Sequence, residues 1–282
     1  MILKDFLPNL ALREFVQCYR IVHFKFEKTA QLPFKAYAPK PEECLHFILQ
    51  DSMQVQLSNC KQKDFFPPIV LIGQQTSVHN RFPGRNFLNF QIVFQPTGIF
   101  RLTGIPAYEL SNQFINAEYI FSKDIRYFLE ELQNAKSYAE MLLIADNFVA
   151  KLICQTQKDE HLLDKAIKQI MLNNGNISLD WLARESCLCT KQFRRKFYER
   201  AGVNPKTYSR IIRFTKAFNT KNRHPSNDWF STAIECGYFD YQHLAKDYKE
   251  FTGLVPNELH LLESKSPECV LGLMDDLYKS RI

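Results

Sequence analysis

The feature that most constrains the fold is an internal repeat: the segment that begins near residue 183 recurs about 50 residues later. Three positions recur at a spacing of 50, and after one inserted residue five more recur at a spacing of 51. The matched pairs are Ala183 with Ala233, Leu188 with Tyr238, Thr190 with Asp240, Phe193 with Leu244, Arg195 with Lys246, Phe197 with Tyr248, Gly202 with Gly253 and Pro205 with Pro256. A repeat of this length indicates one supersecondary unit that is built twice.

Each copy has the pattern of two short helices joined by a tight turn. The first helix carries a small alanine on its buried side, and the second carries apolar residues four positions apart. Thr190 or Asp240 precedes the second helix and is expected to cap it through a side-chain oxygen. Gly202 or Gly253 ends that helix, where a left-handed residue is common. Two helices with a short turn and a small residue at their crossing predict a helix-turn-helix.

Basic residues concentrate in the same region. Nine of them lie between Lys191 and Lys216, against a single acid. Segment 158–262 holds 17 basic and 12 acidic groups, a net charge of +5; segment 1–157 holds 16 and 14, or +2, and segment 263–282 holds 3 and 4, or −1. A run of charge is often only a solvated helix face, so charge alone leaves that alternative open.

The helical period separates a buried side from a charged side. With Phe193 and Phe197 directed toward the core, the opposite arc of the first copy consists of Lys191, Arg194, Arg195 and Tyr198. In the second copy that arc consists of Gln242, Ala245, Lys246 and Lys249. A helix of about three turns fills one stretch of DNA major groove, which is ~12 Å wide. The charged arc is then directed at phosphates and base edges.

The N-terminal part has a different pattern. Between about residues 15 and 100, short β-branched or aromatic segments are separated by Pro, Gly, Asn and Asp, which predicts a sandwich or small barrel. From about residue 118 two segments show three- and four-residue apolar steps and predict helices. Polar residues 155–158 form a plausible boundary. We therefore expect a two-domain α+β chain: an N-terminal domain at 1–155, a helical domain at 158–262 and a tail at 263–282.

At these residues a family resemblance becomes visible. Segment 178–260 resembles the DNA-binding region of the AraC/XylS family of bacterial transcription regulators. The most specific part is the run Cys-Gly-Tyr-Phe-Asp at 236–240, followed by His243, Gly253 and Pro256. The stretch "FQIVFQPTGIFRLTGIPAYELSN" resembles the end of the effector domain in a subgroup of this family, where a cupin-like β-barrel precedes helices.

The resemblance implies roles for particular residues. In the first recognition helix it implies DNA contacts by Lys191, Arg194 and Arg195, and in the second by Tyr241, Gln242 and Lys246. Arg can bridge guanine O6 and N7, and Gln can bridge adenine N6 and N7. Arg210, on the linking helix "PKTYSRIIRFTKAF", is expected to reach at most a phosphate.

The sequence also departs from the family at its turns. Cys187 stands where the first turn usually has Gly, and a left-handed backbone there would cost roughly 1–2 kcal/mol. Cys189 and Phe239 stand where a capping Ser is common, so Thr190 and Asp240 are the candidates for that role. These departures concern local turn geometry rather than the motif.

Metal, cofactor and catalytic chemistry have weak signals. Cys187, Cys189 and Cys236 lack the spacing of a zinc site and are better explained as structural thiols, with a redox sensor as the alternative. His46 and His79 lack the family pattern of cupin metal ligands. No nucleophile motif, metalloprotease motif or phosphate loop occurs, so we expect no enzyme activity, no metal and no cofactor.

Two features of the N-terminal domain leave alternatives open. Six phenylalanines either line an apolar effector pocket or form the sheet core: Phe24, Phe26, Phe47, Phe87, Phe90 and Phe94. Two helical stripes form either a dimer seam or a cover for their own barrel. The first stripe is Phe121, Ile125, Phe128, Leu129 and Leu132, and the second is Met141, Leu142, Ile144, Ala145, Phe148, Val149 and Leu152.

The sequence thus predicts a cytoplasmic transcription regulator whose partner is double-stranded DNA. No signal peptide or apolar span of ~20 residues is evident, so we expect no membrane partner. A small-molecule effector, RNA polymerase and a second copy of the chain are further candidate partners. The main alternative is a helical protein-interaction module that has lost DNA binding, and a catalytic cupin is a weaker one.

Overall fold

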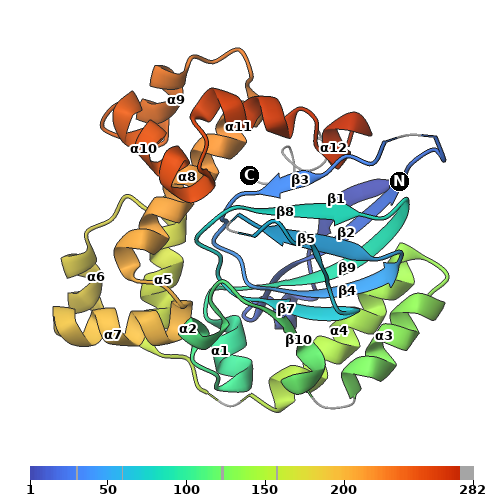
Figure 1. Ribbon diagram of the computed structural model, residues 1–282. Helices are drawn as coiled ribbons and strands as arrows, with labels where there is room; N and C mark the ends of the chain where they lie inside the picture. The colour runs from blue at the N-terminus through green and yellow to red at the C-terminus, as the bar shows by residue number, and fades with distance from the viewer. Residues whose placement is uncertain (30, 59, 122–123, 157, 274–282) are drawn as a thin grey trace.

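The strands of the N-terminal part form two antiparallel sheets (Figure 1). The computed structural model describes residues 1–29, 31–58, 60–121, 124–156 and 158–273. The larger sheet has the order β1 (Ile2–Phe6), β2 (Val16–Lys25), β9 (Asn86–Phe94), β4 (Cys44–Gln50), β7 (Ile69–Ile72) and β10 (Phe114–Asn116). The smaller sheet has the order β3 (Lys35–Tyr37), β8 (His79–Pro83), β5 (Met53–Leu57) and β6 (Asp64–Phe65).

The predicted barrel is not closed among the described strands. Strands β3 and β6 form the edges of the smaller sheet and pair only with β8 and β5, so no described ladder joins the two sheets. The arrangement is closer to the sandwich that the sequence left as the alternative.

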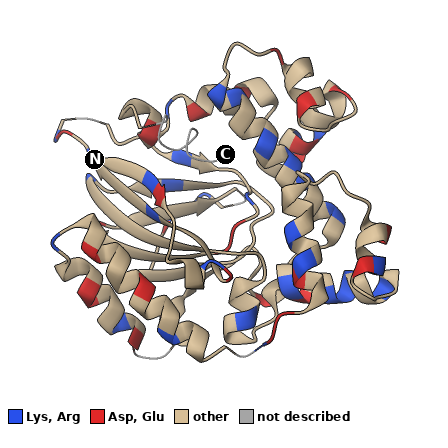
Figure 2. Ribbon diagram, turned by 180° about the vertical axis from the view of Figure 1, so that it is seen from behind, with Lys and Arg blue, Asp and Glu red and all other residues tan. Residues whose placement is uncertain are grey.

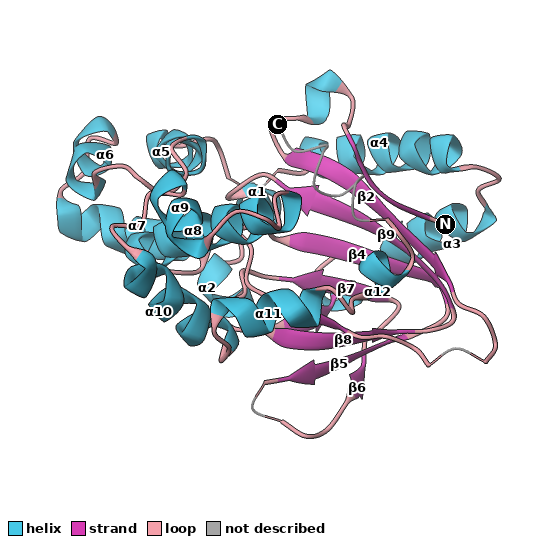
Figure 3. Cartoon of the chain, turned by 90° about the horizontal axis from the view of Figure 1, so that it is seen from above, coloured by secondary structure: helices cyan, strands magenta, loops and turns pink. Residues whose placement is uncertain are grey.

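One face of the larger sheet is covered by two helices, α3 (Asp124–Asn134) and α4 (Tyr138–Cys154), as Figure 3 shows from above. Phe128 on α3 stacks on Phe148 of α4 at 4.1 Å between ring centroids, and Phe47 of β4 meets the Phe128 ring edge-on at 4.7 Å. The buried members of the two apolar stripes therefore cover their own sheet. Tyr127 and Leu143 remain exposed on the outer side.

The aromatic side chains do not line a common pocket. Because side chains alternate along a strand, Phe47, Phe90 and Phe94 face the helices, whereas Phe24 and Phe87 lie in the cluster between the sheets. The first three belong to the sheet core, whereas Phe24 and Phe87 also line a small cavity of about 20 Å³.

The other regular elements of the described chain are helices. Three short turns of helix connect strands: η1 (Leu10–Leu12), α1 (Gly98–Thr103) and α2 (Ala107–Leu110). A fourth, η2 (Ala117–Tyr119), follows β10 and precedes α3. After residue 158 come α5 (Leu162–Leu172), α6 (Leu179–Glu185), α7 (Thr190–Ala201), α8 (Pro205–Arg223), α9 (Trp229–Glu235), α10 (Tyr241–Thr252), α11 (Pro256–Glu263) and α12 (Pro267–Val270). Helix α8 connects two helical groups (Figure 1). Residues 274–282 of the predicted tail lie outside the described residues.

The repeat in the sequence is also a repeat of backbone geometry. Cys187 and Gly237 occupy the same place in the two turns and have φ values of 54° and 82°. In each copy the next residue donates a hydrogen bond from its backbone N–H to the carbonyl of the buried alanine, at 3.0 Å. Gly202 and Gly253 end the second helices with φ values of 75° and 73°. The left-handed residues were placed correctly by the pattern, including the unfavourable one at Cys187.

The two predicted caps have different outcomes. Asp240 accepts a hydrogen bond from the backbone N–H of His243 at 2.8 Å and caps α10 as expected. The prediction for Thr190 was wrong, because α7 starts at Thr190 and Cys189 takes the cap position. There the backbone N–H of Cys189 donates to Oε1 of Gln192 at 3.2 Å.

Among the described residues, no helix combines the length and the apolar character that crossing a membrane requires.

Candidate nucleic-acid interface

Helix α7 presents a basic face to solvent. Phe193 and Phe197 are buried at 1% and 0% exposure, so they fix the orientation of the helix. Lys191, Arg194 and Arg195 are consequently exposed on the other side. Figure 2 shows Lys and Arg positions along α7 and along α8. The three residues predicted for the first helix therefore lie together on one accessible face.

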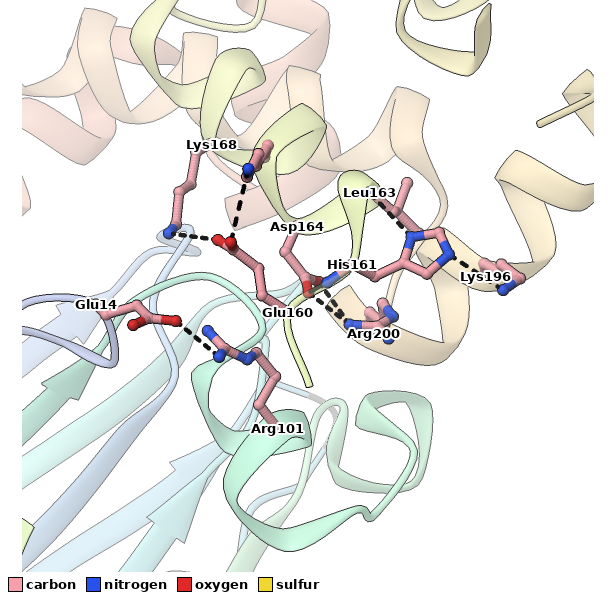
Figure 4. Close-up of polar contacts among 10 residues, drawn as sticks. Glu14, Arg101, Glu160, His161, Leu163, Asp164, Lys168, Lys196 and Arg200 are labelled. Carbon is pink, nitrogen blue, oxygen red and sulfur yellow. Dashed lines mark hydrogen bonds and ion pairs between the residues drawn. The ribbon is translucent and has the colours of Figure 1, made fainter. Parts of the chain in front are cut away.

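The buried side of α7 is anchored to α5 by an ion pair (Figure 4). Nη1 of Arg200 donates to both carboxylate oxygens of Asp164, at 2.7 and 2.6 Å, and Asp164 is fully buried. The same carboxylate accepts from the backbone N–H of His161 at 2.8 Å and so caps α5. Lys196 Nζ lies 3.4 Å from Nε2 of His161. Arg200 is thus a structural member of the basic run.

The N-terminal domain contacts one end of this helix. Tyr108 on α2 stacks on Tyr198 of α7, with centroids 5.1 Å apart and ring planes 10° from parallel. Ser111 Oγ donates to the carbonyl oxygen of Gly202 at 2.7 Å. The Arg200 guanidinium lies 4.7 Å from the ring centroid of Phe100 on α1. Because Tyr198 belongs to the predicted outward arc, the N-terminal domain borders the basic face.

Helix α10 offers a smaller set of free polar groups. Leu244 and Tyr248 are buried, and Gln242 and Lys246 are exposed. Tyr241 is only half-buried and packs against the apolar cluster of this helical group. Of the three residues predicted for the second helix, Gln242 and Lys246 are therefore exposed.

Arg210 lies on the linking helix α8, as the sequence predicted, but its guanidinium has protein partners that the sequence did not indicate. Its Nε and Nη2 donate to Oδ1 of Asp247 on α10 at 2.9 and 2.7 Å, and its Nη1 donates to Oε1 of Glu250 at 2.8 Å. Tyr238 Oη donates to the other oxygen of Asp247 at 3.1 Å. These acidic partners hold the pKa of Arg210 above its ordinary value. Because carboxylates on α10 engage its guanidinium, we now expect Arg210 to support the orientation of α10 rather than to contact a phosphate.

The two candidate faces lie on helices that α8 joins. This helix has 19 residues, so its length is about 28 Å at 1.5 Å per residue. One turn of B-DNA spans about 34–36 Å. The length of α8 is therefore comparable with the distance between two helices that enter successive stretches of major groove.

The cysteines and histidines show no metal arrangement. Cys187 and Cys189 are exposed and Cys236 is buried. Within the described part of the chain, no group of three His, Cys, Asp or Glu residues could hold a metal ion. His46 Nδ1 lies 3.0 Å from Nδ2 of Asn89, and Nε2 of His79 accepts from Nε of Arg81 at 2.9 Å. Burial lowers the pKa of both imidazoles well below the ordinary value, which favours their neutral forms.

A polar cavity between the two sheets was missed by the sequence reasoning. It has a volume of about 40 Å³, and Arg20, His46, His79, Arg81 and Gln91 are among the residues that line it. The signal was present, because polar residues alternate with apolar ones in strands whose two faces are both buried: Arg20 in β2, His46 in β4 and Gln91 in β9.

Comparisons with known proteins found one family model and several solved structures of low sequence identity. Residues 4–116 match the model of a family described as Domain of unknown function (DUF6597), and no curated protein matches the sequence. A structure of ToxT from Vibrio cholerae aligns at 12% identity and a TM-score of 0.49, covering 86% of this chain and 98% of the ToxT chain. Wild-type ToxT bound to an unsaturated fatty acid aligns at 13% identity and 0.47, covering 88% and 96%. The AraC-like transcriptional activator CuxR aligns at 15% identity and 0.23, covering 99% and 84%.

The likeness to ToxT and CuxR is one of structure, at 12–15% identity. These three TM-scores are below 0.5, so the functional interpretation rests on the side chains of α7 and α10 and on the cavity between the sheets.

Proposed function

We propose that the chain is a sequence-specific DNA-binding transcription regulator of the AraC/XylS kind. In this proposal α6–α7 and α9–α10 act as two helix-turn-helix units, and residues 158–262 form the DNA-binding domain. The observation that carries the proposal is the exposed trio Lys191, Arg194 and Arg195 on a helix whose opposite side is fixed by buried phenylalanines and the Arg200–Asp164 ion pair.

The available donors fit base and phosphate contacts. Arg194 and Arg195 can each engage a guanine edge with two parallel hydrogen bonds, and Gln242 can engage an adenine edge in the same way. Lys191 and Lys246 supply point charges for phosphates or guanine. Phosphate contacts set the position of the protein, and contacts to base edges set the sequence.

The proposal is tested with the full chain and a library of random duplexes. Selected sites should contain two short boxes about 10 base pairs apart, which need not be palindromic because the two helices differ in sequence. About six phosphate contacts would give a slope near −5 for log affinity against log salt concentration. Binding that is indifferent to salt between about 50 and 200 mM would contradict the proposal and favour a protein-interaction module.

Two triple variants with the same change in net charge distinguish the contribution of the α7 face to DNA binding from that of overall charge. Replacing Lys191, Arg194 and Arg195 by alanine should abolish site selection. The control replaces Lys25, Arg126 and Lys151, which are exposed on the N-terminal domain, and has the same charge change. Equal loss of affinity in both variants would mean that general electrostatics, and not α7, accounts for binding.

The N-terminal domain, residues 1–155, is proposed as the sensing unit. The polar cavity between its sheets is the candidate effector site, and the exposed outer side of α3 and α4, with Tyr127 and Leu143, is a candidate surface for a second copy of the chain. RNA polymerase is the proposed further partner of a DNA-bound regulator. Light scattering of the full chain with and without duplex measures whether a dimer forms.

A further inference from the structure

The end of the described chain lies against the N-terminal domain. Helices α11 and α12 lie above β3 in Figure 1. Lys35 on β3 forms ion pairs with Glu263 at the end of α11, at 2.7 Å, and with Glu268 on α12. The three residues are 6%, 3% and 2% exposed. Two carboxylates that follow the helical domain are therefore buried against one ammonium group of the N-terminal sheet.

A second cation in the same place lacks a carboxylate partner. Arg81 on β8 is 5% exposed, and its guanidinium lies 3.8 Å from the ring centroid of Tyr37. Its Nε donates to His79, but within the described ranges no carboxylate lies at ion-pair distance from it. Burial lowers the pKa of Arg81 from its ordinary value. Glu42 lines the same polar cavity as Arg81 and stabilises the charge of Arg81 from a distance, but its carboxylate is paired with Arg20 at 3.1 Å. A buried guanidinium with no carboxylate at ion-pair distance is costly, so the space beside it is suited to an anion.

Other polar atoms beside Arg81 also lack partners. Nδ1 of His79 and Oδ1 of Asn89 are buried and have no hydrogen-bond partner in the described structure. Asn89 and Arg81 line the same small cavity, together with Lys35 and Glu268. Unmet donors and acceptors around an unpaired guanidinium indicate a site that is built for a polar ligand.

The space is too small for an organic ligand while α12 is in place. Two adjoining cavities of about 40 and 20 Å³ share Tyr37, Arg81 and Gln91. A single water needs about 10–15 Å³ by this measure, so the cavities hold a few waters at most. Pro267 and Glu268 form part of the wall of the smaller cavity. Withdrawal of α12 is the change that would enlarge it.

We propose that the space between the sheets binds a small ligand that carries a carboxylate or phosphate group, and that segment 263–270 is its internal competitor. The ligand anion pairs with Arg81 and Lys35, Glu268 loses its partner, and α12 leaves the sheet. Regulation of DNA binding by this replacement of Glu268 by the ligand rests on the proposed DNA-binding function. The binding site and the release of α12 do not rest on it.

The competitor is mechanically connected to the second helical pair. Nδ1 of His260 on α11 lies 3.0 Å from Oδ1 of Asn222 on α8. Leu259 of α11 packs in the same apolar cluster as Phe251 of α10. Freeing Glu263 and Glu268 from Lys35 would therefore loosen the helix that supports α10.

The test uses the full chain without DNA, with acetate and inorganic phosphate as separate probes at constant ionic strength set by chloride. Hydrogen–deuterium exchange of segment 264–271 should accelerate as the anion is added. In Glu268→Gln that segment should exchange rapidly without anion, and the better of the two anions should bind at least tenfold more tightly than to the unmodified chain. The matched control, Glu130→Gln, removes an exposed carboxylate on α3 and should change neither quantity.

A second substitution tests the cation. In the Glu268→Gln background, Arg81→Gln should remove anion binding; where that variant does not fold, Arg81→Lys should weaken it at least fivefold. Equal anion binding by the unmodified chain and Glu268→Gln would overturn the competition, and unchanged binding after the Arg81 substitution would overturn the site. Because no DNA is present, neither result depends on whether α7 and α10 read bases.

Discussion

The guanidinium of Arg210 on α8 donates two hydrogen bonds to one carboxylate oxygen of Asp247 on α10, at 2.9 and 2.7 Å. Asp247 is 5% exposed, and its second oxygen accepts from Tyr238. The linking helix is thereby joined to the second candidate reading helix by a nearly buried ion pair. The orientation of α10 relative to α8 depends on this contact.

Arg210→Ala should destabilise the protein by about 2–3 kcal/mol, because it leaves a nearly buried carboxylate without its cation. Urea unfolding followed by circular dichroism measures the loss. Lys249→Ala, at an exposed basic position of α10, serves as the control and should change stability by less than about 0.5 kcal/mol. The salt slope of DNA binding should not change in Arg210→Ala, and a slope flatter by about one unit would show a phosphate contact instead.

Arg195→Ala should weaken binding to the selected site by roughly 1–3 kcal/mol and relax preference at one base pair. The side chain is exposed and has no described protein partner, so its removal should leave folding stability almost unchanged. Library binding of the variant and of Arg126→Ala on α3 gives the comparison. An unaltered base preference would leave Arg195 as a phosphate contact.

Cys187→Gly should stabilise the chain by about 0.5–1 kcal/mol. The left-handed backbone at φ 54° costs a non-glycine residue roughly 1–2 kcal/mol, and glycine removes this strain. Glycine also increases the conformational entropy of the unfolded chain, which offsets part of the stabilisation. The mirrored change, Gly237→Ala, should destabilise, since the same backbone is required and the new Cβ would lie 1.9 Å from Nδ2 of Asn176. Thermal unfolding measures the melting temperature of both variants. A change of the same sign in both would contradict the conclusion that residues 187 and 237 share one backbone geometry.

Gly202→Ala and Gly253→Ala together test the contact between α2 and α7. Both residues are left-handed, so both substitutions carry the same strain. At Gly202 the new Cβ would also lie 2.2 Å from Oγ of Ser111, whereas nothing lies within 4 Å of it at Gly253. We expect a larger loss of stability and faster hydrogen exchange of residues 107–110 only in Gly202→Ala. Identical behaviour would mean that the N-terminal domain does not hold α7 in solution.

Glu43 should make stability depend on pH. Its carboxyl oxygens are buried without a hydrogen-bond partner among the described residues, and burial raises its pKa to about 8. The folded chain then keeps a proton that the unfolded chain releases near pH 4–5, so stability falls as pH rises between about 5 and 8, by up to about 1.4 kcal/mol per unit. Glu43→Gln should lose this component, and Glu130→Gln should keep it. Parallel pH profiles of the unmodified chain and Glu43→Gln would refute the assignment.

The sequence by itself determined the two helix pairs, their C-terminal glycines, the cap at Asp240 and the outward direction of Lys191, Arg194 and Arg195. These features depend on interactions within a few residues: the helical period, the conformational freedom of glycine and the reach of a short capping side chain. The repeat made each of them visible twice. The strands of the N-terminal part were also placed, because alternation and turn residues are local signals.

Only the tertiary structure decided which basic residues are free. Arg195, Arg200 and Arg210 are equivalent members of one charge run, but Asp164 and Asp247 lie 36 and 37 residues from their partners Arg200 and Arg210. Lys35 meets Glu263 and Glu268 across 228 and 233 residues. No local pattern encodes such distances, because the pairs form only where packing brings separate elements together and removes water from between the charges. For the same reason the polar cavity, and the helix that closes it, became visible only in the folded chain.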